Sequence, residues 1–67
     1  MGRFKGEIAD IMRMRGLDVA GLSIESGVPE EDLDAYIYYG KNVPEWEAGK
    51  VASALGVSPD IIYESDG

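Results

Sequence analysis

The chain has 67 residues, which is enough for one domain and too few for several. It contains no Cys, so neither a disulfide nor a zinc–thiolate site can stabilise it, and its core must come from packed helices. Thirteen acidic residues outnumber six basic ones and give a net charge of −7, so DNA repels the chain on average and any DNA site must be a local basic patch.

The first predicted helix covers residues 3–15 and ends at Gly16. Its apolar residues recur at helical spacing and form one stripe: Phe4, Ile8, Ile11 and Met12. Asp18 is the expected N-cap of a second helix over residues 19–26, in which Leu22 faces the core. Gly27 then supplies a left-handed turn, and Val28 anchors that turn in the core.

The third predicted helix covers residues 29–39 and begins with Pro29, which suits the first helical position. Glu30, Glu31 and Asp32 fill its first turn, where carboxylates favour the positive end of the helix dipole. Its buried face is expected to hold Leu33, Tyr36 and Ile37, and Gly40 ends it.

A loop is expected to lead to a fourth helix over residues 45–55, followed by a short fifth helix over residues 59–63. The fourth helix is predicted to turn four side chains inward: Trp46, Val51, Ala52 and Leu55. Ile62 and Tyr63 are predicted to close the core, and residues 64–67 to fray. No strand is expected, so the predicted fold is an all-α domain of five helices spanning residues 1–67.

Several segments of the chain resemble one known family in their order and spacing. They are Arg15-Gly16-Leu17, Leu22, Ser26-Gly27-Val28, Leu33, Tyr36, Gly40-Lys41, Pro44 and Val51-Ala52-Ser53-Ala54-Leu55-Gly56-Val57-Ser58. In this pattern the chain resembles the Cro/repressor-type helix-turn-helix domains, also called XRE-like, over residues 8–63. The resemblance implies a five-helix lambda-repressor-like helix-turn-helix domain. Members are mostly phage or bacterial transcription regulators that bind operators as dimers.

The resemblance implies that the second and third helices read double-stranded DNA, with the third in the major groove. The corresponding DNA-contacting positions are Val19, Pro29, Glu30, Glu31, Asp34 and Lys41. Val19 replaces the family's usual Gln and cannot bond a phosphate. Residues 29–35 carry four acids and no base, whereas the family usually has polar or basic residues at the outward positions. Like charges facing each other in an interface cost several kcal/mol.

Two other functions remain open. A helix-turn-helix-like protein could act through protein contacts without DNA, its acidic third helix mimicking DNA against a basic regulator protein, as in an antirepressor. Candidate partner or homodimer residues are then Ile24, Tyr38, Tyr39, Val43 and Ile61. The alternative is a halophile's regulator that binds DNA at high salt.

Catalysis and membrane insertion are not expected. The chain has no His and no Cys, so the commonest acid–base and nucleophilic residues are missing, and no catalytic residue, metal site or cofactor is predicted. No apolar run approaches the ~20 residues of a membrane span. The first six residues lack the apolar stretch of a signal peptide, so a cytoplasmic location is the default expectation.

Overall fold

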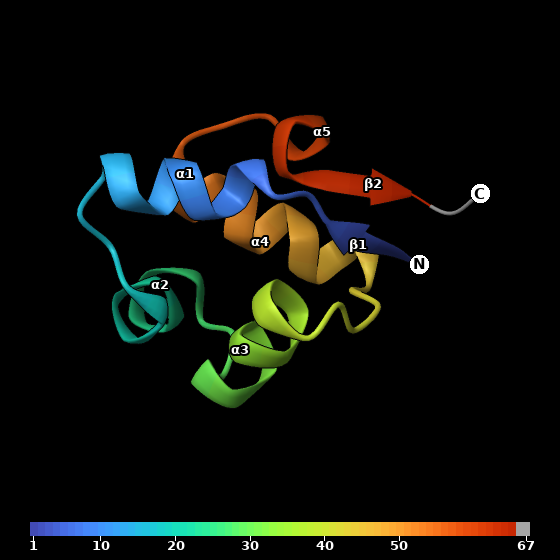
Figure 1. Ribbon diagram of the computed structural model, residues 1–67, viewed down its shortest axis with the longest axis horizontal. Helices are drawn as coiled ribbons and strands as arrows, with labels where there is room; N and C mark the ends of the chain where they lie inside the picture. Colours follow the sequence, from blue (N-terminus) through green and yellow to red (C-terminus); the bar gives the residue numbers. More distant parts are fainter. Residues whose placement is uncertain (66–67) are drawn as a thin grey trace.

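The computed structural model describes residues 1–65, which form a mainly helical fold with one small sheet. The elements in chain order are β1 (Gly2–Phe4), α1 (Glu7–Met14), α2 (Val19–Ser26), α3 (Glu30–Tyr38), α4 (Glu45–Leu55), α5 (Pro59–Ile62) and β2 (Tyr63–Ser65). Figure 1 shows α4 in the middle, with α1 and α5 on one side of it and α2 and α3 on the other. Among the described residues, no helix has the length and apolar content needed to cross a membrane.

The prediction that the chain contains no strand is wrong, because its two ends pair as an antiparallel sheet. Gly2, Arg3 and Phe4 lie opposite Ser65, Glu64 and Tyr63, so the first helix begins only at Glu7. Residues 64 and 65 therefore do not fray, whereas the prediction for residues 66 and 67 lies outside the described part. The sheet needs glycine at its start, since a Cβ on Gly2 would overlap the carbonyl oxygen of Glu64.

Gly2 also holds the loop between α3 and α4. Its backbone N–H donates to the carbonyl oxygen of Val43 at 3.2 Å, and the N–H of Val43 donates back to Gly2 at 2.6 Å. This bridge draws Val43 inward until its side chain is fully buried. The prediction of an exposed Val43 in a partner surface is therefore wrong.

The segment from α2 to α3 has the helix cap and the left-handed turn that the sequence predicts. The Asp18 carboxylate accepts a hydrogen bond from the N–H of Gly21 at 2.7 Å and caps α2. Gly27 ends α2 with a φ of 78°, and the Ser23 hydroxyl donates to the carbonyl oxygen of Val28 at 2.6 Å. Val28 is buried, as predicted, and Pro29 stands one residue before α3 as its N-cap rather than within it.

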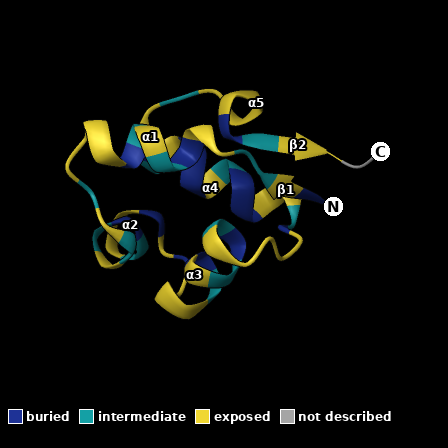
Figure 2. Cartoon of the chain, in the orientation of Figure 1, coloured by how far each residue is buried: buried dark blue, intermediate teal, exposed yellow. Residues whose placement is uncertain are grey.

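The core lies around α4 (Figure 2). Its buried apolar residues are Ile8, Met12, Leu22, Val28, Leu33, Tyr36, Val43, Ala48, Val51, Ala52, Leu55 and Ile62. Tyr63, predicted to close the core, is half-buried at the start of β2 and packs against this cluster.

The prediction that Trp46 faces the core is wrong, because its side chain is 66% exposed. The buried stripe of α4 runs through Glu47, Val51 and Leu55 at intervals of four residues, and Ala48 and Ala52 lie beside it. Trp46 stands one residue before this stripe begins, and that places the indole on the solvent side.

Candidate functional site

The exposed face of α3 carries three carboxylates. Glu30, Glu31 and Asp34 are exposed, whereas Leu33 and Tyr36 are buried and fix the other face of the helix in the core. Pro29 is exposed beside them. No basic residue lies within α3, so its outward surface is negative along most of its length.

Lys41 is the base that follows α3 in sequence. Its backbone N–H donates to the carbonyl oxygen of Ala35 at 3.1 Å, which folds the chain back after Gly40. Its ammonium lies 5.9 Å from the centre of the Tyr36 ring, and the side chain is exposed. The exposed Lys41 side chain therefore lies beyond the C-terminal end of α3, with its ammonium near the Tyr36 ring.

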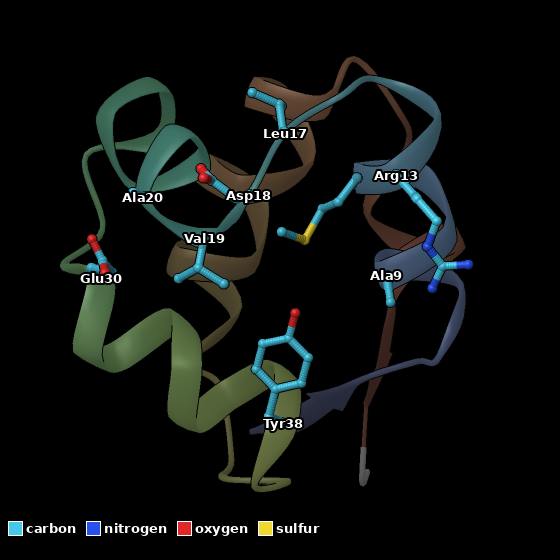
Figure 3. A pocket seen from close by; sticks show the side chains of 9 residues that line it. Ala9, Arg13, Leu17, Asp18, Val19, Ala20, Glu30 and Tyr38 are labelled. Carbon is cyan, nitrogen blue, oxygen red and sulfur yellow. The ribbon is translucent and has the colours of Figure 1, made fainter.

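An open hollow of about 480 Å³ separates α1 from α3 and the start of α2. Its lining residues are Ala9, Met12, Arg13, Leu17, Asp18, Val19, Ala20, Glu30 and Tyr38. Figure 3 shows the Tyr38 hydroxyl pointing into the hollow and Arg13 extending away from it. Of the predicted DNA-contacting residues, Val19 and Glu30 both line this hollow. Glu31, Asp34 and Lys41 are not among its lining residues.

The hollow shows what the side chain of Val19 contacts. The side chain is half-buried and packs against the core cluster, and it forms part of a largely apolar wall. An apolar side chain there gives no hydrogen bond to a phosphate.

The basic residues are spread over several elements, and most have contacts of their own. Arg13 pairs with Asp10 at 3.7 Å, and the guanidinium of Arg15 lies beside Gly56. Further contacts involve Arg3 with the Asn42 side chain at 3.4 Å, Lys5 with the Asp60 carbonyl oxygen at 3.0 Å, and Lys50 with the Trp46 ring at 5.2 Å. These cations come from β1, α1, α4 and the residues that flank α1, and none belongs to α3, although Arg13 lines the hollow together with Glu30.

A buried hydrogen bond fixes α3 to α4. The Tyr36 hydroxyl donates to the Glu47 carboxylate at 2.6 Å, and both residues are buried. Burial raises the pKa of the Tyr36 hydroxyl well above its ordinary value, and the hydrogen bond to Glu47 and the negative charges of Glu47 and Asp32 add to the shift. Sequence reasoning missed Glu47, although its spacing of four from Val51 places it on the buried stripe.

Four of the five predicted partner residues are exposed. The exposed fractions are 84% for Ile24, 62% for Tyr38, 81% for Tyr39 and 44% for Ile61, and Val43 is the exception described above. Sequence reasoning missed three other large exposed side chains, Met1 at 65%, Met14 at 84% and Trp46 at 66%. Among the described residues, no group of three or more carboxylates is placed to hold a metal ion.

No model of a known protein family matches the chain, and comparisons with curated proteins and with solved structures found no similar protein. Function must therefore be inferred from the geometry of α2 and α3 and from the sequence resemblance.

Proposed function

We propose that the chain is a small transcription regulator of the Cro/repressor helix-turn-helix type, with a lambda-repressor-like fold. The observation that carries the proposal is the α2–α3 unit. Its two short helices are joined by a tight turn at Gly27, with Val28 buried beneath the turn. Leu22 and Leu33 bury the inner sides of the two helices and leave the outer side of α3 in solvent.

In this proposal the outer side of α3 enters the major groove and Lys41 contacts the DNA backbone. Glu30 stands at the start of α3, where residues of a recognition helix meet base edges, and a carboxylate there can accept from the N4 amino group of cytosine. Lys41 supplies one phosphate contact, and Val19 supplies none. Few phosphate contacts predict weak non-specific binding with a shallow dependence on salt.

A second candidate function is supported by the three exposed carboxylates of α3. With no base within α3 to neutralise them, these groups repel phosphates, and specific DNA binding gains only ~4–10 kcal/mol over non-specific binding. The same face attracts a basic protein surface, and the exposed Tyr38 and Tyr39 at the end of α3 are suited to a protein interface. The chain would then regulate by occupying the DNA-binding surface of a basic regulator.

Fluorescence anisotropy of a labelled mixed-sequence duplex at low salt distinguishes the two candidates. We compare the wild-type chain with a triple variant, Glu30→Gln, Glu31→Gln and Asp34→Asn. A control of equal charge change neutralises exposed acids at the starts of other helices, Glu7→Gln, Glu45→Gln and Asp60→Asn.

If α3 faces DNA, the triple variant should bind roughly a hundredfold more tightly than the control variant, because the three lost carboxylates each remove ~1 kcal/mol of repulsion at about 4 Å in water. If neither the wild-type chain nor the variants bind DNA, DNA reading by α3 is refuted. Wild-type binding to a purified basic helix-turn-helix regulator, abolished in the triple variant only, then supports the second function. Folding and DNA binding that require molar salt would instead indicate a halophile's regulator.

A further inference from the structure

The hollow between α1 and the α2–α3 unit has the size and the wall of a small-molecule site. Its volume of about 480 Å³ lies within the range of roughly 300–1,000 Å³ that is usual for ligand pockets. Apolar side chains make up most of its wall: Ala9, Met12, Leu17, Val19 and Ala20. Because Ala9, Leu17 and Val19 are only half-buried, a molecule seated in the hollow covers apolar surface that the chain alone leaves in water.

Two polar side chains of the hollow are not used by the fold itself. Among the described residues, neither the Glu30 carboxylate nor the Tyr38 hydroxyl takes part in a hydrogen bond or an ion pair. The Tyr38 hydroxyl nevertheless points into the hollow (Figure 3). The other carboxylate of the lining, Asp18, accepts from the N–H of Gly21 and caps α2. Glu30 and Tyr38 are therefore the groups left to bind a ligand.

The charge of the hollow selects a cation. Asp18 and Glu30 bring two carboxylates to its lining, and Arg13 is the only base among its described lining residues. The Arg13 guanidinium pairs with Asp10 at 3.7 Å and extends away from the hollow (Figure 3). The hollow therefore attracts a cation and repels an anion.

The length of α3 sets the shape of that cation. Glu30 and Tyr38 are the first and last residues of α3, so they stand about 12 Å apart along the helix axis. A compact ion cannot contact both groups. An elongated molecule can, with an ammonium group at one end, a hydrogen-bonding group at the other, and an apolar body between them.

We propose that this hollow binds a small organic cation, a primary amine joined to an aromatic body. The ammonium binds the Glu30 carboxylate, the ring packs on Leu17 and Val19, and a polar atom of the ring system hydrogen-bonds with Tyr38. The site does not depend on which function α3 serves. Because Glu30 is one of the three exposed acids of α3, the bound cation neutralises part of that face under either function.

A titration of the isotope-labelled full chain, followed by amide NMR spectra, tests the site with tryptamine as the probe. Tryptamine should shift the amides of Ala9, Val19 and Ala20 in a saturable way. Indole-3-propionate has the same ring and the opposite charge, and it should bind at least tenfold more weakly. Equal affinity for the two probes, or no saturable shift at these amides, would overturn the proposal.

Paired variants separate binding at the hollow from general attraction to an acidic chain. Glu30→Gln should weaken tryptamine binding about fivefold, whereas Glu31→Gln, an equal charge change at an exposed residue outside the hollow, should leave it nearly unchanged. Tyr38→Phe should also weaken it about fivefold, and Tyr39→Phe should not. The proposal is wrong if the two members of each pair have the same effect.

Ala20→Leu tests whether the ligand needs the empty space. Ala20 is an exposed residue of α2 that lines the hollow, and leucine is nearly as good a helix former, so the variant should keep the amide spectrum of the folded chain. The larger side chain fills part of the hollow and should weaken tryptamine binding tenfold or more. Tighter binding would mean that the probe adheres to any apolar surface, a result that contradicts a defined site.

Discussion

Replacing Tyr36 by phenylalanine removes the hydrogen bond that ties α3 to α4. The hydroxyl lies 2.6 Å from the Glu47 carboxylate, and Tyr36 and Glu47 are only 6% and 8% exposed. A hydrogen bond to a charged group contributes about 1.5–3 kcal/mol, and its loss leaves a buried carboxylate without this donor. We therefore expect Tyr36→Phe to lower the free energy of unfolding by about 2 kcal/mol.

A loss of this size is easy to measure in so small a domain. At roughly 0.05–0.15 kcal/mol per residue, the whole chain is stable by only about 3–10 kcal/mol. Urea unfolding followed by far-ultraviolet circular dichroism should show a lower midpoint with an unchanged m-value. Tyr38→Phe is the matched control, because the Tyr38 side chain is 62% exposed, and it should change the stability by less than about 0.5 kcal/mol.

A double variant tests whether the stability lost in Tyr36→Phe comes from leaving the Glu47 carboxylate buried without its hydrogen-bond donor. When both partners of a buried hydrogen bond become apolar, the cost can be close to zero, so adding Glu47→Leu to Tyr36→Phe should recover part of the lost stability. The reasoning is refuted if Tyr36→Phe costs no more than Tyr38→Phe.

Three further predictions concern the folded state. The pKa of Tyr36 is raised in the folded chain above the ordinary value of 10.0, so its contribution to stability is complete below pH 10.0 and is lost as pH rises above it. The wild-type chain should therefore lose stability above that pH more steeply than Tyr36→Phe, by up to about 1.4 kcal/mol per pH unit, in urea titrations at alkaline pH. Asp18→Ala should cost about 1 kcal/mol of unfolding free energy through loss of the α2 cap, and an equal stability of variant and wild type would contradict this role. Gly2→Ala should lower the thermal midpoint by an amount equivalent to about 1–3 kcal/mol through overlap with Glu64, whereas Gly6→Ala, whose Cβ has open space, should not lower it.

The parts of the fold that the sequence predicted correctly are those controlled by neighbouring residues. The bounds of α2 follow from Asp18 as cap and Gly27 as left-handed end, and those of α4 from Pro44 before it and Gly56 after it. These signals act within one helical turn of the residue that carries them, so they can be read without knowledge of the tertiary structure.

The errors arose where distant segments decide the outcome. Phe4 has the right spacing for the stripe of α1, yet pairing with Tyr63, which is distant in sequence, makes residues 2–4 a strand. The same contact network buries Val43 through its bridge to Gly2. Trp46 was misplaced for a different reason: its size favoured the core, but the register of α4 gave the buried position to Glu47, whose charge is satisfied by Tyr36.

The three exposed acids of α3, Glu30, Glu31 and Asp34, differ in whether they stabilise the helix that carries them. Pro29, the N-cap, has no side-chain hydrogen-bond acceptor, so Glu30 and Glu31 in the first turn stabilise the positive end of the helix dipole at a site without a capping side chain. Asp34 lies beyond that turn and one helical turn after Glu30 on the same exposed face, where a like-charge pair is destabilising by about 0.2–0.5 kcal/mol. Helix stability therefore accounts for the first two acids and not for Asp34. Of the three, Asp34 is therefore the acid that either proposed function, rather than the stability of α3, would explain.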